Sequence, residues 1–247
     1  MNEPLLILDN VVAGYGKMTI LNGTMARIRR GAITTVIGPN GAGKSTLFKT
    51  IFGLLTVRSG SITIDGRATT NFEPRAMLDA GVAYVPQGRN IFPELSVAHN
   101  LELGAVALKD QAGVPARVDA IMQRFPMLRD KARAQASTLS GGQQKILEVA
   151  RSLLLDPKLL LIDEPSIGLS PLMVQEVFDI LKGLRDRGVT ILLIEQNAKQ
   201  ALQMSDFGLV LEQGQTRIED TAPAILGDAR IAQLFLGGGL EPVAAAS

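Results

Sequence analysis

Residues 38–46 read GPNGAGKST, a glycine-rich turn that ends in lysine, serine and threonine. The β-branched stretch at residues 33–37 precedes this turn, and helical periodicity begins at about Lys44. A strand, a turn of the form G-x-x-x-x-G-K-[ST] and a helix, in that order, are typical of a phosphate-binding loop. Glycines let the backbone wrap closely around an anion, and successive N–H groups at the start of the helix then point at its oxygens.

The residue types in this phosphate loop predict their roles. Lys44 can reach the β- and γ-phosphates of a nucleotide, and Ser45 can offer its hydroxyl to Mg²⁺. The alternative is a glycine-rich turn that only caps a helix, and the Lys-Ser-Thr register after a strand argues against it. We therefore predict that the nucleotide is bound by Gly38, Pro39, Asn40, Gly41, Ala42, Gly43, Lys44, Ser45 and Thr46.

Two carboxylates follow a second buried strand. Residues 159–162 are all apolar, and Asp163 and Glu164 come directly after them. Asp163 is placed to hold Mg²⁺, directly or through water, and Glu164 can polarise a water for attack on the γ-phosphate. The alternative is an Asp-Glu pair that caps the next loop. The presence of a phosphate loop in the same chain makes the catalytic interpretation the better one.

A third strand ends in one acid and two amides. Residues 190–194 run directly into Glu195, Gln196 and Asn197. Polar residues at the carboxyl ends of buried strands are how α/β proteins build sites. The chain contains a single histidine, His99, which lies elsewhere in the sequence, so this strand end carries no imidazole.

Composition limits the class of protein. The 247 residues, 46% of them apolar, suit one large domain or two intimately joined pieces. The net charge of +1 gives no general attraction for nucleic acid, and the absence of cysteine suits a reducing cytoplasm. The apolar runs fall far below the ~20 residues that cross a bilayer, and the N-terminus lacks a signal-peptide pattern. We expect a soluble chain that reaches a membrane only through a partner.

Hydrophobic periodicity predicts alternating strands and helices. Strands are expected at residues 5–12, 24–28, 33–37, 61–66, 82–85, 159–162, 189–194 and 208–211. Helices are expected at about 44–53, 97–109, 116–125, 142–154 and 172–187, the last closed by Gly188. Residues 13–16 are expected to form a loop, and Arg30 and Gly31 the turn of a hairpin.

Strand signals stop at about Gly88 and return after Leu155, which indicates a helical insert of roughly 65 residues. We therefore expect one domain over residues 1–236. Its core comprises residues 1–87 and 156–236, its helical subdomain residues 88–155, and a flexible tail follows at 237–247.

A further stretch, Leu139-Ser-Gly-Gly-Gln143, lies between the phosphate loop and the carboxylate pair. Together these motifs resemble the ATP-binding cassette (ABC) ATPases over nearly the whole chain. The resemblance implies an α/β fold: a P-loop NTPase (RecA-like) core with an antiparallel β subdomain and an inserted α-helical subdomain. It also implies ATP and Mg²⁺ as ligands, Tyr15 stacked on adenine, and Gln87 as a sensor of Mg²⁺ and the attacking water.

In that family the Leu-Ser-Gly-Gly-Gln stretch caps the nucleotide bound by a second subunit. Its residues allow this role, since a Ser-Gly-Gly turn that opens a helix presents free N–H groups to an anion. If this turn lies too far from Lys44 to share one ATP, two chains must pair head to tail. The alternative is an ordinary helix cap. The residues concerned are Ser140, Gly141, Gly142 and Gln143.

Two positions depart from the common family pattern. Gln196 stands where most cassette ATPases carry a histidine that touches the γ-phosphate, and an amide offers donors for that phosphate and an acceptor for water. The alternative is that Gln196 only caps the following helix. Ser170 stands at about the place of an aspartate that contacts the other subunit.

The sequence is more closely similar to the smaller ATPase subunit of branched-chain amino-acid importers, through residues 84–93, 165–171 and 194–198. That likeness implies that the chain pairs with a homologous ATPase subunit or with itself. It also implies that membrane permease subunits contact the chain near residues 89–92, and that a substrate-binding protein is an indirect partner. It places the chain on the cytoplasmic side of the inner membrane, without nucleic acid as a partner. The alternatives are a urea or short-amide importer, a soluble ABC ATPase without a transport role, and a slow nucleotide-gated binding module.

Overall fold

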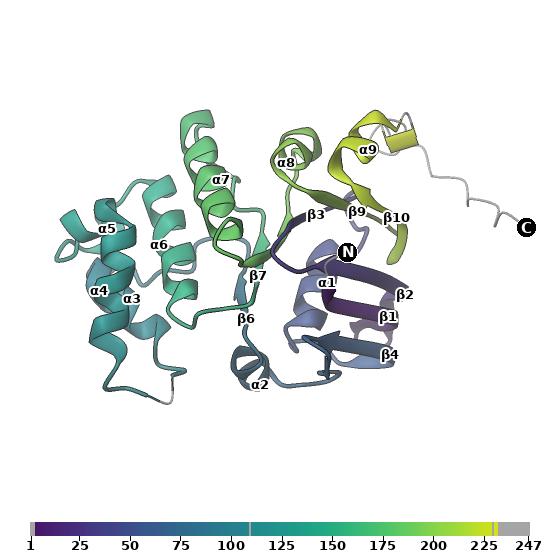
Figure 1. Ribbon diagram of the computed structural model, residues 1–247, viewed down its shortest axis with the longest axis horizontal. Coiled ribbons are helices and arrows are strands. Elements are labelled where there is room, and N and C mark those ends of the chain that lie inside the picture. The colour runs from purple at the N-terminus through teal and green to yellow at the C-terminus, as the bar shows by residue number, and fades with distance from the viewer. Residues whose placement is uncertain (1–2, 109, 229, 232–247) are drawn as a thin grey trace, which may run out of the picture.

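The computed structural model describes residues 3–108, 110–228 and 230–231, so the predicted tail at 237–247 lies outside the described residues. Two sheets and a lobe of helices make up the described chain (Figure 1). The strands are β1 (Pro4–Tyr15), β2 (Met18–Arg29), β3 (Ile33–Ile37), β4 (Val57–Ile64), β5 (Arg67–Ala68), β6 (Val82–Val85), β7 (Leu159–Asp163), β8 (Thr190–Ile194), β9 (Phe207–Glu212) and β10 (Gln215–Thr221). The helices are α1 (Lys44–Ile51), α2 (Pro74–Asp79), α3 (Val97–Gly104), α4 (Val114–Arg124), α5 (Pro126–Asp130), the 3₁₀ turn η1 (Ala136–Thr138), α6 (Gly141–Leu153), α7 (Pro171–Arg185), α8 (Ala198–Met204) and α9 (Ala222–Gly227).

The six-stranded sheet has the order β10-β9-β3-β8-β7-β6 and is parallel except for the hairpin of β9 and β10. Strands β3, β7 and β8 are buried at every position, because a central parallel strand is covered on both faces. The expected hairpin across Arg30 and Gly31 is wrong. Strand β2 pairs with β1 in the other sheet, whereas β3 enters the parallel sheet between β8 and β9.

The second sheet is antiparallel, with the order β2-β1-β4-β5. Strand β1 continues to Tyr15, so the loop expected at residues 13–16 is strand up to that residue. The strand expected at residues 61–66 ends at Ile64, and a turn at Asp65 and Gly66 joins β4 to β5. The prediction of an α/β fold with an antiparallel β subdomain is therefore confirmed.

Both faces of the parallel sheet are covered. Along β7, Leu159 and Leu161 point to a core shared with α1 and the antiparallel sheet, whereas Leu160 and Ile162 point to a core shared with α6 and α7. This alternation follows from the two-residue period of a strand. A smaller core packs α8 and α9 against β3 and β9.

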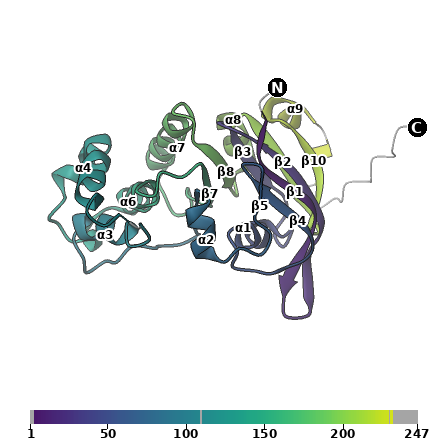
Figure 2. The same cartoon turned by 60° about the horizontal axis from the view of Figure 1, so that its bottom comes forward.

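The insert between β6 and β7 is helical, as predicted, with slightly different bounds. Helix α3 ends at Gly104 where residue 109 was expected, and that residue lies outside the described chain. Helices α4, α6 and α7 begin one or two residues earlier than expected. Figures 1 and 2 show α3 and α4 at one end of the molecule and β1, β2 and β4 at the other.

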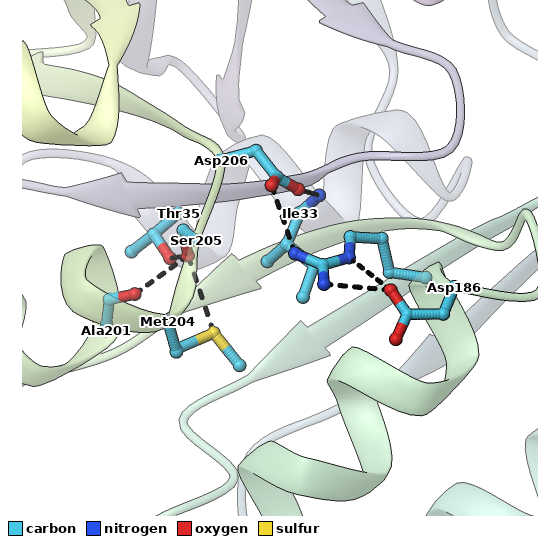
Figure 3. A network of polar contacts seen from close by, with 8 residues as sticks. Ile33, Thr35, Asp186, Ala201, Met204, Ser205 and Asp206 are labelled. Atoms are coloured by element: carbon cyan, nitrogen blue, oxygen red, sulfur yellow. Dashed lines mark hydrogen bonds and ion pairs between the residues drawn. The ribbon is translucent and has the colours of Figure 1, made fainter.

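A polar network secures the amino end of β3, at the sheet edge opposite to the phosphate loop (Figure 3). The Asp206 carboxylate accepts from the Ile33 N–H (2.8 Å) and from the Arg185 guanidinium of α7 (3.0 Å). The hydroxyls of Thr35 and Ser205 lie 2.6 Å apart beside it. These contacts tie β3, α7 and the start of β9 together, and so fix the strand from which the phosphate loop emerges.

Candidate nucleotide site

Four parallel strands end at one edge of the sheet and bring the predicted residues together there. The phosphate loop follows β3, Gln87 follows β6, Asp163 closes β7 and Gln196 follows β8. The register pairs Asp163 with Ile194 and Val36 with Ile194, so these ends are level. Sites in open α/β sheets form at this carboxyl edge.

Glycines shape the phosphate loop by allowing close approach. A Cβ on Gly38 would lie 2.0 Å from the Leu211 carbonyl oxygen, so only glycine fits there. Gly43 has a left-handed φ of 100° directly before α1 begins. The Lys44 ammonium donates to the carbonyls of Gly38 (2.8 Å) and Pro39 (3.1 Å). Burial lowers the pKa of Lys44, while the charges of Glu164 and Asp163 oppose that shift.

Asp163 is a buried carboxylate that fits a hard cation. Its Oδ1 atom is buried and has no hydrogen-bond partner among the described residues, and its Oδ2 atom lies 3.5 Å from the Tyr84 hydroxyl. Burial raises the pKa of Asp163, while Ser45, Lys49, Tyr84 and Lys44 act in the opposite direction. Mg²⁺ prefers such oxygen ligands, and an orphaned carboxylate oxygen beside a serine hydroxyl suits it.

One carboxylate oxygen of Glu164 accepts hydrogen bonds from the side-chain amides of both Gln87 and Gln196. The Gln87 Nε2 donates to Glu164 Oε2 at 2.7 Å, and the Gln196 Nε2 donates to the same atom at 3.1 Å. Glu164 itself has a left-handed φ of 49° directly after the end of β7, a conformation that is uncommon for a residue other than glycine. Burial, and then the charge of Asp163, raise the pKa of Glu164.

The three polar residues after β8 have three different partners. The buried Glu195 carboxylate accepts from the Ser166 N–H (2.9 Å) and from its hydroxyl (2.6 Å). Gln196 contacts Glu164, and Asn197 caps α8 by accepting from the Gln200 N–H (3.1 Å). The alternative in which Gln196 only caps the next helix is therefore wrong, because Asn197 takes that role.

The Ser-Gly-Gly turn opens α6 as a capping box. The Ser140 hydroxyl accepts from the Gln143 N–H, and the Gln143 side chain accepts from the Ser140 N–H (3.1 Å). Gly142 packs against α7, since a Cβ there would lie 2.1 Å from the Met173 Cε. Within the described residues, no hydrogen bond or ion pair joins residues 140–143 to the phosphate loop. In Figures 1 and 2, α6 lies apart from α1.

Tyr15 lies at the end of β1 and is 44% exposed. The Lys49 ammonium of α1 lies 5.8 Å from the centre of the Tyr15 ring and 3.5 Å from its hydroxyl. The ring therefore lies beside the helix that follows the phosphate loop and is partly exposed to solvent. His99 is an exposed residue of α3, away from the carboxyl edge of the sheet.

Sequence reasoning missed two contacts at this edge. Tyr84 lies under Asp163, with its ring against Phe48 and Phe52, and Glu195 holds the loop after Glu164 through Ser166. The signal for Glu195 was its place at the same strand end as Gln196. Tyr84 offered no comparable signal, because an aromatic in a buried strand is typical of a core.

The sequence matches the family model described as ABC transporter over residues 21–167. It is 39% identical over 234 residues to the high-affinity branched-chain amino acid transport ATP-binding protein BraG of Pseudomonas aeruginosa, covering 95% of this chain and 100% of the relative. It is 41% identical over 226 residues to the probable branched-chain amino acid transport ATP-binding protein LivF of Archaeoglobus fulgidus, covering 91% of this chain and 95% of the relative.

The fold is similar to solved ABC cassettes. The crystal structure of the ADP conformation of an ATP-binding cassette of an ABC transporter superposes with a TM-score of 0.85 at 28% identity, covering 95% of this chain and 99% of the other. A nucleotide-free cassette from an ABC transporter gives a TM-score of 0.82 at 28% identity, covering 94% and 98%. Across the part of the chain that the structure describes, no helix has the length and apolar character to cross a membrane.

Proposed function

The chain belongs to the ABC transporter family and is one of its ATPases, and from that premise we propose that it powers a branched-chain amino-acid importer. The cargo rests on the two relatives above, whose names specify branched-chain amino-acid transport and whose lengths the chain covers almost completely. The reaction rests on the acid-amide cluster in which Gln87 and Gln196 both donate to Glu164.

In the mechanism we propose, the phosphate loop holds the nucleotide phosphates through its N–H groups. Lys44 exchanges the carbonyls of Gly38 and Pro39 for phosphate oxygens. Glu164 accepts a proton from the attacking water, and Gln87 and Gln196 orient its carboxylate. Tyr15 stacks on the adenine.

Mg²⁺ would be held by Ser45, Asp163 and Gln87, and it supplies charge neutralisation between the phosphate oxygens. The orphaned Oδ1 of Asp163 supports this assignment. The Ser-Gly-Gly turn acts on the nucleotide of a second subunit, either a homologous ATPase or a second copy. We further propose that permease subunits hold the chain at the cytoplasmic side of the membrane, in contact with residues 89–92.

The test of the reaction is Mg²⁺-dependent ATP hydrolysis by purified protein. Glu164→Gln should lower kcat by about 10²- to 10⁴-fold, because it removes the general base, and should leave ATP binding intact. Retention of wild-type turnover by this variant would overturn the assignment of Glu164.

The test of the cargo is uptake of labelled leucine by cells that lack the chain. Loss of leucine uptake, restored by wild type but not by Glu164→Gln, supports the importer. Loss of urea or short-amide uptake with leucine uptake unchanged would favour the second candidate, a related importer for those solutes.

A further inference from the structure

Helix α6 carries a buried ion pair that the site described above does not use. The Lys145 ammonium and the Glu148 carboxylate lie 2.6 Å apart, one turn apart on α6, and their side chains are 7% and 2% exposed. Buried ion pairs contribute little net stability, because desolvation of both charges offsets their attraction. We therefore looked to the other contacts of this pair for a role besides stability.

Both charges also bond to the segment that follows Gln87. Lys145 Nζ donates to the Gly88 carbonyl (3.0 Å), and Glu148 Oε1 accepts from the Asn90 N–H (2.6 Å). One turn further along α6, the Arg151 guanidinium donates to the Asn90 carbonyl. Three successive positions on one helix face thus hold the backbone of residues 88–90.

The same segment is fastened to the rest of the insert as well. The side chain of the buried Asn100 on α3 accepts from the Phe92 N–H (2.8 Å) and donates to the Phe92 carbonyl (2.9 Å). The Asn90 amide donates back to the Pro86 carbonyl (2.9 Å), which fixes the turn that contains Gln87. Residues 88–92 are therefore bonded to the helical lobe, while the Gln87 side chain reaches Glu164 in the sheet.

We propose that Lys145 and Glu148 are positioning residues that fasten residues 88–90 to α6, so that the Gln87 amide and the Ser140 end of α6 keep a fixed spacing. This inference rests on the proposed function and deepens it. The pair acts through Gln87, whose Nε2 lies 2.7 Å from the catalytic carboxylate. Both groups are also hydrogen-bonded to backbone atoms, so the two charges cannot be exchanged. The ammonium must face the Gly88 carbonyl, and the carboxylate must face the Asn90 N–H.

The first test removes both charges and keeps the volume, with Lys145→Met/Glu148→Leu. Replacing a buried pair with apolar side chains is commonly neutral or stabilising, so the melting temperature should stay level or rise. The affinity for ATP should change less than twofold, while kcat falls by at least tenfold. A stable protein that binds ATP and turns over slowly is a result that a merely structural role of the pair does not produce.

The second variant, Lys145→Glu/Glu148→Lys, keeps an ion pair at the same spacing but reverses it towards the backbone. A carboxylate cannot donate to the Gly88 carbonyl, and an ammonium cannot accept from the Asn90 N–H. We expect a similar loss of kcat. The control is Asp179→Ala/Lys182→Ala, which removes an ion pair of the same spacing on α7 (3.8 Å) and should leave kcat within twofold of wild type.

A cycle with Gln87→Ala decides whether the pair acts through Gln87. In the Gln87→Ala background, Lys145→Met/Glu148→Leu should change kcat by less than twofold. An independent loss in that background, or a wild-type kcat in both charge variants, would overturn the proposal.

Amide hydrogen exchange provides a readout without turnover. Exchange at the Asn90 N–H should accelerate at least tenfold in Lys145→Met/Glu148→Leu, with exchange in α4 unchanged; unchanged exchange at Asn90 would overturn the proposal. If wild type does not hydrolyse ATP, the proposed function fails, whereas the exchange result still decides whether the pair holds the segment.

Discussion

Gln196 donates to Glu164 at a place where an imidazole would add a titration of its own. The amide keeps the same donor at every physiological pH, because it has no proton that titrates near neutrality. The single histidine of the chain, His99, lies on the exposed face of α3. At the scale of single residues, the consequence is a pH profile set by carboxylates.

We therefore expect the pH profile of kcat to lack an imidazole limb. Gln196→His should add one near pH 6.5, and Gln196→Ala should lower kcat by roughly 10- to 100-fold, because a hydrogen bond to a charged group contributes about 1.5–3 kcal/mol. Steady-state hydrolysis measured from pH 5.5 to 9 checks both. A Gln196→His profile that superimposes on wild type would contradict contact of this position with the reaction.

Glu195 makes a different prediction, about stability. Burial raises the pKa of this carboxyl above its ordinary value of 4.5, even though Ser166 donates to it twice. The ionised form is thus disfavoured in the folded protein, and this cost exists above the folded pKa and disappears below the ordinary one. Glu195→Gln removes the charge and keeps an acceptor for the Ser166 N–H.

The free energy of unfolding of Glu195→Gln, relative to wild type, should therefore be highest at pH 8 and should decline as the pH falls towards 4. Urea titrations at several pH values measure it. Ser166→Ala is the control, and it should destabilise the protein at pH 8 by about 1 kcal/mol because it removes a donor from the carboxylate. A relative stability that grows towards acid pH would contradict the sign of the shift.

At the scale of elements, the contact between α6 and α7 depends on one missing side chain. A Cβ on Gly142 would lie 2.1, 2.8 and 2.9 Å from the Cε, Cγ and Cβ atoms of Met173, so the two helices would have to separate. The neighbouring Gly141 has much more room, since its nearest atom is the Leu169 Cδ2 at 3.7 Å.

Gly142→Ala should lower the free energy of unfolding by about 1–3 kcal/mol through overpacking. Gly141→Ala, the matched control, should stay within about 0.5 kcal/mol of wild type. Denaturant midpoints of the two variants provide the comparison. Equal stabilities would show that Met173 moves aside without cost.

Elements with a strong hydrophobic pattern were predicted from the sequence, and elements without one were missed. Strand β3 is a β-branched run, β7 and β8 are mostly apolar, and α7 has a clear apolar face, so all four elements were predictable. Strand β10 is a polar edge strand, half-exposed along its length, and α2 has six residues, so neither has a readable pattern. The false hairpin at Gly31 came from taking neighbours in sequence as partners in a sheet, whereas β3 pairs with strands near residues 190 and 210.

The site divides in the same way. The phosphate loop, Asp163 and Glu164 follow from sequence because a motif fixes their chemistry. The convergence of Gln87 and Gln196 on one oxygen of Glu164 could not be predicted from the sequence. It depends on the ends of two strands, β6 and β8, that lie more than 100 residues apart in the chain. Glu195 was visible at its strand end, but its partner Ser166 became evident only in three dimensions.

For the whole molecule, the separation of the Ser-Gly-Gly turn from the phosphate loop predicts association. Glu164→Gln with Mg²⁺ and ATP should elute as a dimer, at twice the mass of the 26.3 kDa chain, and as a monomer without nucleotide. Ser140→Glu added to that variant should prevent the dimer, because a carboxylate would face a phosphate. Light scattering coupled to gel filtration measures the mass.

The proposed partner is either a second copy of the chain or a homologous ATPase subunit, so the same experiment includes co-expression with a homologous ATPase subunit. A Glu164→Gln protein that stays monomeric with saturating nucleotide, both by itself and with that subunit, would contradict the shared site.

The helical insert is also the connection that returns the chain from β6 to the parallel strand β7 beside it. Such a crossover needs only a dozen or so residues, so the topology of the sheet does not require a lobe of this size. Helix α6 covers one face of β7 and must stay, but the rest of the lobe could be exchanged or shortened without changing the order of the strands. The insert begins next to Gln87 at the carboxyl ends of the strands and joins β7 at its amino end, away from the site. A replacement lobe could therefore influence the reaction through its first connection to the sheet, whereas its second connection would only hold it in place.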